Sequence, residues 1–162
     1  MLGRQKLKSG GMRNCPKCGS RMTLSALADC GGSAHDYSVR FVNLPTLVCR
    51  DSSHPRRFVD SEFGFRLVNS LHDALPLARR RFLRRPGCRR CGAALTGTIA
   101  PSSTMFEITV DMDNAPTFSV ALSGRTTTCT QCGLEQLAHD RTFYGNMPDA
   151  VLAAFKAVHL ER

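Results

Sequence analysis

The 162-residue sequence has no tryptophan and only two tyrosines, so nine phenylalanines supply most of its aromatic content. A domain of about 80 residues with so few large aromatic side chains buries a thin hydrophobic core, and domains of that size often depend on a disulfide or a bound metal. The length allows either one domain or two small ones. If there are two, their stability must come partly from something other than core burial.

Long apolar runs are also missing. No stretch approaches the roughly 18 consecutive apolar residues of a membrane-spanning helix. The basic N-terminal segment, which includes Lys6 and Lys8, is not followed by the apolar region of a secretory signal. We therefore expect a cytoplasmic protein with no membrane partner.

Lysine is scarce although the chain is basic. The formal net charge is +9, but only four of the 22 basic residues are lysines, so arginine dominates. Arginine side chains form bidentate contacts with phosphate and carboxylate groups. Seven arginines cluster in one part of the sequence and are candidate nucleic-acid contacts: Arg79, Arg80, Arg81, Arg84, Arg85, Arg89 and Arg90.

The eight cysteines carry the clearest pattern. Six of them form three Cys-x-x-Cys pairs, at Cys15/Cys18, Cys88/Cys91 and Cys129/Cys132. In a reducing compartment such pairs favour metal ligation over a disulfide framework. A structural metal would supply the stabilisation that the thin core lacks.

An internal repeat organises the chain. Cys15–Gly19 aligns with Cys88–Gly92 at an offset of 73, and Cys49 aligns with Cys129 at an offset of 80 that continues without a gap into the C-terminal part of each copy. The repeat predicts a flexible basic tail over 1–11, one unit over 12–80, an Arg-rich linker over 81–87 and a second unit over 88–162.

Each unit has the same expected order of elements. Alternating apolar and polar residues predict strands at Tyr37–Val42, Leu47–Val48, Phe106–Val110 and Phe118–Leu122. Apolar residues at helical spacing then predict a closing helix in each unit, with Phe65, Val68, Leu71 and Leu75 in the first, and Val151, Leu152, Phe155 and Val158 in the second. The segment Asn146–Asp149 is the expected start of the second helix. The fold class is α+β: two tandem zinc-ribbon-like units, each a small antiparallel sheet with zinc knuckles and a C-terminal helix.

The second unit predicts a complete metal site. Cys88, Cys91, Cys129 and Cys132 come from two tight turns separated by a hairpin, and four thiolates arranged in this way suit tetrahedral Zn²⁺. Glycine follows each pair and tolerates the positive φ that such turns require. Four protein ligands leave no open coordination position, so the expected zinc is structural.

The first unit predicts a degenerate site. Cys15, Cys18 and Cys49 are retained, but Ser52 stands where the repeat places Cys132. Serine is a poor zinc ligand, and the candidates for the fourth ligand are His54 and Cys30, with His35 behind them. We expect two zinc ions per chain, or one if the first site is dead.

The first copy combines Cys15-Pro16-Lys17-Cys18-Gly19 with Asn43-Leu44-Pro45 shortly before Cys49. This order resembles the YgiT-type zinc finger, the zinc-binding half of MqsA-like antitoxins, although Ser52 departs from its pattern. Copy two keeps all four cysteines. The resemblance implies a zinc-stabilised interaction module in two divergent tandem copies. The helix-turn-helix half that binds operator DNA in that family has no counterpart here.

Three functional classes can be weighed on the sequence. Closed ligand sets without a catalytic constellation favour a non-enzymatic zinc-binding module that mediates interaction with an unidentified protein, with regulation among the roles open to it. The alternative is DNA or RNA binding through the Arg-rich linker face. A redox enzyme would place Cys-x-x-Cys after a strand and at the start of a helix, whereas here Gly and strands follow the pairs.

Overall fold

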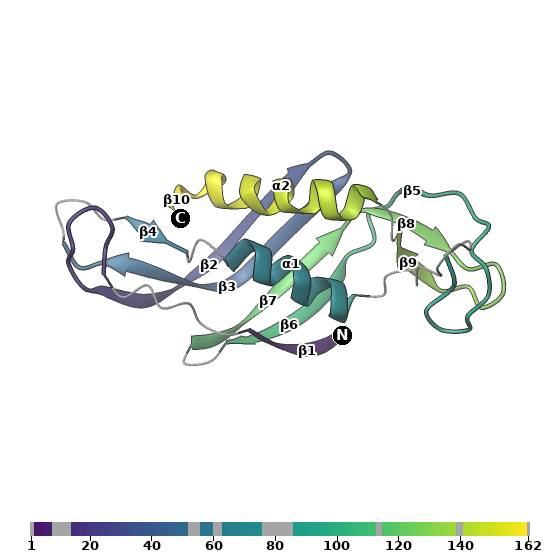
Figure 1. Ribbon diagram of the computed structural model, residues 1–162, viewed down its shortest axis with the longest axis horizontal. Coiled ribbons are helices and arrows are strands. Elements are labelled where there is room, and N and C mark those ends of the chain that lie inside the picture. The colour runs from purple at the N-terminus through teal and green to yellow at the C-terminus, as the bar shows by residue number, and fades with distance from the viewer. Residues whose placement is uncertain are drawn as a thin grey trace.

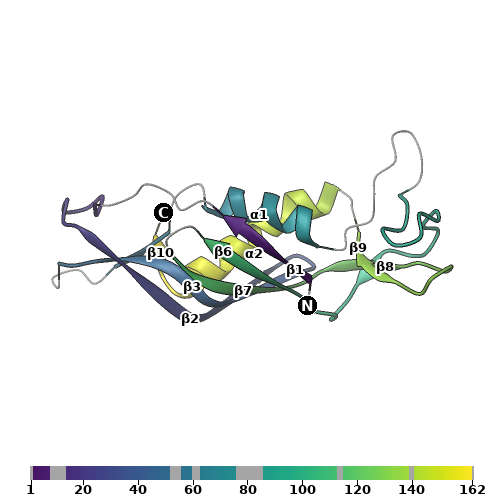
Figure 2. The same cartoon turned by 90° about the horizontal axis from the view of Figure 1, so that it is seen from below.

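The computed structural model describes residues 2–7, 14–51, 56–59, 63–75, 86–112, 115–138 and 141–161. The fold is α+β, as expected, with a large curved sheet, two helices and a second small sheet beyond one end of the large one (Figure 1). Both helices lie on the same face of the large sheet (Figure 2). None of the described helices is long and apolar enough to cross a bilayer.

The large sheet has seven strands and is mostly antiparallel. Its path is β1-β6-β7-β3-β4-β10, and β2 pairs with β3 beside this path. The strands are β1 (Leu2–Leu7), β2 (Met22–Ala34), β3 (Tyr37–Cys49), β4 (Arg57–Phe58), β6 (Phe106–Met112), β7 (Ala115–Ser123) and β10 (Leu160–Glu161). The small sheet contains β5 (Ala100–Pro101), β8 (Arg125–Thr128) and β9 (Glu135–Leu137), and the helices are α1 (Phe63–Ala74) and α2 (Arg141–Ala157).

The four strand segments predicted from alternation are confirmed as parts of β3, β6 and β7. Two small sheets in tandem units are not confirmed, because the hairpins of the two halves join into one sheet. β3 of the first half pairs antiparallel with β7 of the second, with Phe41 opposite Val120. The sheet therefore crosses the boundary that the sequence repeat indicates.

The hydrophobic core explains why the halves merge. One cluster of buried side chains combines residues of both halves. Its aromatic contacts cross between them, with ring centroids 6.0 Å apart for Tyr37–Phe143, 5.7 Å for Phe41–Phe155 and 6.0 Å for Phe63–Phe118. Each half thus buries its apolar face against the other, and together they form a larger core than about 80 residues usually bury alone.

The segment Leu2–Leu7 is a strand and not part of a flexible tail. It pairs in parallel with β6, from Leu2 opposite Ile108 to Leu7 opposite Met112. Strand β6 already pairs with β7 on its other side, so β1 satisfies the backbone groups of an edge that would otherwise be exposed. The remaining residues of the predicted tail, Met1 and 8–11, lie outside the described residues, as does most of the predicted linker.

The helices preserve the repeat most clearly. Four buried positions of the first half each have a buried counterpart 80 residues later in the same core. The pairs are Phe63 and Phe143, Leu67 and Met147, Leu71 and Val151, and Leu75 and Phe155. The offset found in the sequence therefore continues as shared packing.

The predicted start of α2 is wrong. The helix begins at Arg141, and Pro148 lies inside it, not in its first turn. Proline in a helix interior removes one backbone hydrogen bond and costs about 3 kcal/mol relative to alanine. The extra turn at the N-terminal end buries Phe143 and Met147 completely, and that burial offsets the cost.

Asn43 and Pro45 occupy special positions in β3. Asn43 has a left-handed backbone (φ 60°), which asparagine adopts more readily than most residues. Pro45 lies opposite Ala26 of β2, on a stretch of β3 between its pairings with β7 and with β4. Among the described strands only β2 pairs with β3 at Pro45, so one side of β3 is a free edge there, which is where proline is tolerated in a strand.

Gly32 allows α2 to approach β2. A Cβ atom at this position would lie 2.1 Å from the backbone nitrogen of Ala154 and 2.6 Å from the carbonyl carbon of Ala153. Real contacts of this kind are not found at such distances, so only glycine lets helix and strand backbones touch here. Gly32 thus determines the position of α2 on the sheet.

We predict that Gly32→Ala lowers the free energy of unfolding by about 3 kcal/mol, because helix and strand must separate to admit the methyl group. Gly145→Ala is the matched control, since a methyl group at Gly145, an exposed position of α2, meets nothing within 4 Å. It should raise stability by about 0.5–1 kcal/mol. Denaturant unfolding of the metal-loaded chain measures both, and equal effects would contradict this packing.

Candidate metal centres

Three Cys-x-x-Cys-Gly turns have one common geometry. In each, the N–H of the first cysteine donates to the carbonyl five residues later, and the N–H of the glycine donates to the carbonyl of the first cysteine. The three glycines, Gly19, Gly92 and Gly133, have φ values of 74°, 76° and 69°. Only glycine adopts this backbone without strain, which explains why it follows every pair.

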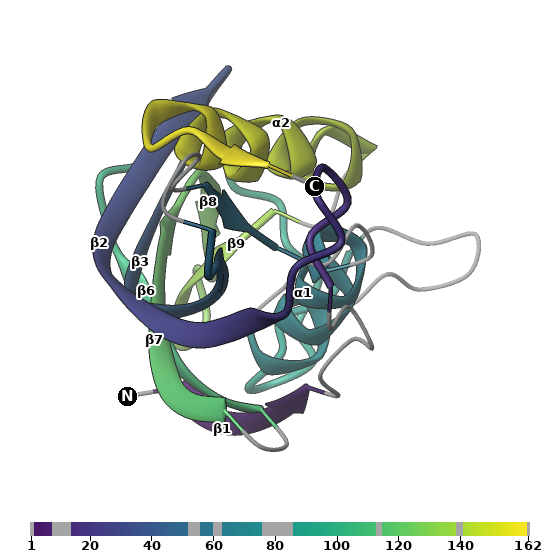
Figure 3. The ribbon, with the colours of Figure 1, turned by 90° about the vertical axis from the view of Figure 1, so that its left-hand side faces the viewer.

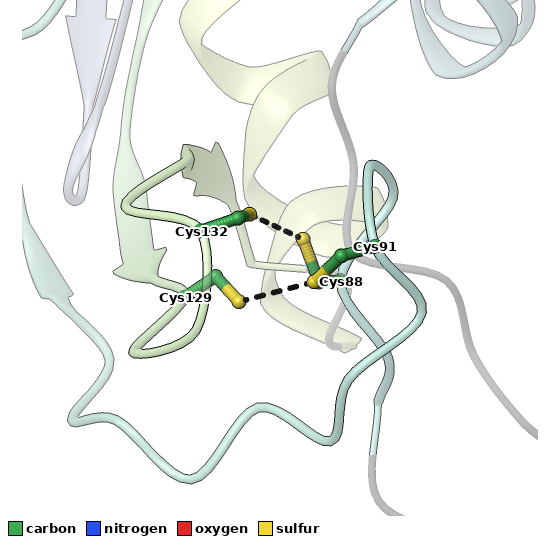
Figure 4. A group of neighbouring side chains, drawn as sticks. All are labelled: Cys88, Cys91, Cys129 and Cys132. Atoms are coloured by element: carbon green, nitrogen blue, oxygen red, sulfur yellow. Dashed lines mark hydrogen bonds between the residues drawn. The ribbon is translucent and has the colours of Figure 1, made fainter.

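Site two brings its four predicted ligands together. The sulfur atoms of Cys88, Cys91, Cys129 and Cys132 all lie within 4.8 Å of one another (Figure 4). The Sγ–Sγ distances are 3.6 Å for Cys88–Cys132 and 3.6 Å for Cys91–Cys129. Four sulfurs about 2.3 Å from one tetrahedral ion would lie about 3.8 Å apart, so the arrangement can hold a metal ion of that kind.

Backbone N–H groups in the Cys88–Gly92 turn favour ionisation of the Cys88 thiol to a thiolate. The N–H of Cys91 hydrogen-bonds to Cys88 and lowers the pKa of this thiol to about 6, against the opposing effect of burial. Cys88 and Cys129 are buried, whereas Cys91 is exposed. Metal binding requires deprotonated sulfur, so N–H donors aimed at a ligand support the site.

Cys132 shows the opposite tendency in the absence of an ion. The N–H of Leu134 lowers its pKa, but burial and the hydrogen bonds with the other three cysteines outweigh that contribution and raise the pKa to about 11. Four thiols this close cannot all ionise without a cation between them. A bound divalent metal removes that conflict.

Gln136 fits beneath site two. Its side chain is completely buried in β9, and its Oε1 accepts a hydrogen bond of 3.0 Å from the backbone N–H of Arg89. Its Nε2 is buried and has no partner oxygen or nitrogen, while the same side chain lowers the pKa of Cys88. A buried amide N–H facing a thiol is costly, but it becomes a favourable donor once that sulfur is a metal-bound thiolate.

Arg89 links this knuckle to α1. Its guanidinium donates from Nη1 to the carbonyl oxygen of Leu75, just beyond the last residue of α1. The last carbonyls of a helix lack partners within the helix and carry partial negative charge, so an arginine there is favourable. Ordering of the knuckle at site two therefore extends to the end of α1.

Glu135 holds the small sheet beside site two. Its carboxylate accepts hydrogen bonds from the hydroxyl groups of Ser102 (2.7 Å), Thr104 (2.8 Å) and Thr126 (2.8 Å). The Ser102 hydroxyl contributes most to lowering the pKa of Glu135, followed by Thr104. One ionised side chain thus joins β8, β9 and the segment before β6.

Site one brings together three of its predicted ligands. The sulfurs of Cys15, Cys18 and Cys49 lie within 4.8 Å of one another, and Cys18–Cys49 is 3.5 Å. The backbone N–H of Asp51 donates to the Cys49 sulfur at 3.4 Å. Because Cys15 and Cys18 precede β2 and Cys49 ends β3, this site closes the open end of the β2–β3 hairpin.

The segment that begins at Cys49 differs from the three Cys-x-x-Cys-Gly turns. The N–H of Cys49 donates to the carbonyl of Arg56, seven residues later and not five. His54, the first candidate for the fourth ligand, falls in this longer loop but lies outside the described residues. His54 as a ligand therefore stays a prediction.

The other two candidates for the fourth ligand do not reach site one. Cys30 is buried in the main core opposite Phe41, away from both groups of cysteines, and burial raises its pKa to about 11. His35 lies at the turn between β2 and β3, with its Nε2 3.4 Å from Asp149 on α2. The hairpin is 13 residues long on each side, which carries both residues far from the knuckle.

Most of the predicted nucleic-acid contacts lie outside the described residues, namely Arg79, Arg80, Arg81, Arg84 and Arg85. The structure describes Arg89 and Arg90 of this set, and both are exposed residues. The Arg89 guanidinium donates to the carbonyl oxygen of Leu75, and this contact joins two parts of the fold. The sequence did not predict this role or the roles of Gln136 and Glu135, because a single polar residue in a turn or in a short strand forms no recognisable pattern.

Comparisons of the chain with family models, with curated proteins and with solved structures found no match.

We predict two metal ions per chain in the purified full-length protein. The pair Cys88→Ser/Cys91→Ser should lose one of them and Cys15→Ser/Cys18→Ser the other, because each pair supplies half or more of one ligand set. Elemental analysis together with protein quantitation measures the ratio.

Cys30→Ala is the control and should retain both ions, since Cys30 belongs to neither group. Loss of both ions from the Cys15/Cys18 variant alone would contradict independent sites. A ratio of one in the native chain would mean that site one does not hold metal.

Proposed function

We propose that this chain is a non-enzymatic, zinc-stabilised module of the cytoplasm whose folded surface binds a partner protein. The observation that carries the proposal is the convergence of Cys88, Cys91, Cys129 and Cys132 on one point. A metal with four cysteine ligands has no position left for water or substrate, so it acts in structure and not in catalysis. Zinc is the metal that four thiolates at this spacing suit best.

The location of the two sites supports a scaffold role. Site one closes the end of the long β2–β3 hairpin, and site two joins the small sheet to the knuckle that contacts α1. Each site would thus order a segment that contributes little to the main core. Such segments have little buried apolar surface of their own and gain most from a bound metal. Small metal-held units of this kind are suited to presenting a rigid surface.

No helix among the described residues covers the second face of the large sheet, so the described structure leaves that face open to a partner (Figure 2). The helices cover the other face (Figure 2), and the buried side chains of Tyr37 and Phe41 in β3 contact Phe143 and Phe155 of α2 there. The alternate residues Arg40 and Val42 are exposed on the open face. An antiparallel sheet commonly leaves one face to solvent, and such a face provides a firm platform for binding.

The resemblance to the YgiT-type zinc finger agrees with this proposal and rests on the motif residues alone. The backbone conformation accounts for both motif residues of β3: Asn43 has a left-handed backbone, and Pro45 lies in a strand position that accepts proline. The resemblance therefore supports a zinc-held interaction module.

Nucleic-acid binding is the second candidate, favoured by the net charge of +9. Phosphate contacts would give an affinity that falls steeply with salt. Within the described residues, Arg90 remains available near site two, while Arg89 contacts Leu75. The candidate thus depends mainly on the predicted linker.

A purification from the native source distinguishes the two candidates. Tagged full-length chain, isolated at physiological ionic strength with nuclease treatment, should retain one protein at a constant molar ratio. Cys88→Ser/Cys129→Ser should lose that protein, because site two no longer closes, whereas Cys30→Ala should keep it.

A bound nucleic acid that nuclease and salt remove would support the second candidate instead. Absence of any stoichiometric protein, or its undiminished retention by the site-two variant, would contradict the first.

A further inference from the structure

Strand β2 is an unusually long sheet edge. It spans 13 residues, from Met22 to Ala34, and pairs with β3 at every residue except Ala28. Within the part of the chain that the structure describes, no strand pairs with its other side, which forms the rim of the curved sheet in Figure 3. Alternate residues of a strand direct N–H and C=O groups to each side, so a row of backbone groups lies along this edge.

The other edges of the two sheets are protected and this one is not. β10 and β5 have two residues each and β9 has three, and the sequence of β1 includes Arg4 and Lys6. Short strands, lysine, proline and inserted charges are the usual means of preventing edge pairing. β2 contains no lysine, arginine or proline, and Asp29 is its single charged residue. In a chain of net charge +9 that composition stands out.

The exposed side chains of β2 suit close approach. Ala26, Ala28, Gly31 and Ser33 are small and exposed, and Leu24 is 45% exposed. A strand that lay beside this edge would meet little steric or electrostatic resistance. It would also remove the apolar surface of Leu24 from water.

The charged residues near β2 are placed so that opposite charges would meet if two copies of the strand paired antiparallel. Between Ser20 and Tyr37 the charged residues are Arg21 at one end and Asp29 and Asp36 toward the other. Asp29 already pairs with Arg40 at 2.6 Å, so its charge is compensated. Asp36 is about half exposed and lies 3.8 Å from Arg125, which leaves room for a second cation.

We propose that β2 pairs with β2 of a second copy of this chain, antiparallel and about a twofold axis at Ala28, so that the two large sheets become one. This register places Leu24 opposite Gly32 of the second copy. It also brings Arg21 to the His35–Asp36 turn of that copy, where opposite charges meet at both ends of the interface. The compensated Asp29 lies next to the axis, where a free carboxylate would repel its symmetry mate.

The net positive charge does not oppose this arrangement. At physiological ionic strength the screening length is about 8 Å, so the distant arginines of the two copies interact weakly. The pairing uses the edge of the sheet and leaves its open face free. It is therefore independent of the partner protein proposed above.

Sedimentation equilibrium of the metal-loaded full-length chain tests the dimer. The wild type should approach twice 17.8 kDa as concentration rises. Ala26→Lys/Ala28→Lys should raise the dissociation constant about tenfold or more, because like charges face each other across the axis. Mixing it with Ala26→Glu/Ala28→Glu should restore a dimer of the two variants.

Ala94→Lys/Ala100→Lys is the matched control, since it adds the same charge at exposed positions near the small sheet. It should dimerise as the wild type does. In hydrogen exchange, the amides of Met22–Ala34 should become more protected with rising concentration. A mass of 17.8 kDa at every concentration, or a dimer that the β2 lysines leave unchanged, would overturn the proposal.

Discussion

Mutual repulsion among closely spaced thiolates is the constraint on which this structure depends. At site two, four sulfur atoms lie within 4.8 Å of one another, and three of them converge in the same way at site one. Such groups can ionise together only around a cation. The pKa of Cys88 is lowered by backbone N–H donors while that of Cys132 is raised by burial and its cysteine neighbours, as expected where four thiols share one small space. A divalent ion would resolve the conflict and would hold the two turns of site two together, in addition to their small apolar cluster.

The main core and the metal sites have separate roles. The core joins both halves through contacts such as Tyr37–Phe143 and Phe63–Phe118, so neither half is an independent folding unit. The knuckles lie away from it and have only small apolar clusters of their own, for example Cys15, Met22, Cys49 and Phe58. A metal ion held by either group of cysteines would therefore stabilise an end of the fold, while aromatic packing stabilises its centre. Arg89 connects the two by reaching from the knuckle of site two to the end of α1.

Local features of this chain were predictable and long-range ones were not. The ligands of site two could be found because two tight turns must each offer both sulfurs to one ion, which fixes the spacing within each pair. Strands such as Phe106–Val110 follow from alternation within a few residues. The pairing of β3 with β7 leaves no such local signal, since it depends on which apolar faces lack cover in each half. The first turn of α2 was not predicted, because proline usually lies near the start of a helix and Pro148 here lies inside one. The burial of Phe143 outweighs that local preference.

X-ray absorption at the zinc edge tests the central claim most directly. The sample is the full-length chain with site one removed by Cys15→Ala/Cys18→Ala, so that the bound zinc reports on site two alone. The account predicts four sulfur scatterers at about 2.3 Å and no nitrogen or oxygen in the first coordination shell. Fewer than four sulfurs, or a nitrogen or oxygen ligand in that shell, would contradict a closed structural site formed by Cys88, Cys91, Cys129 and Cys132.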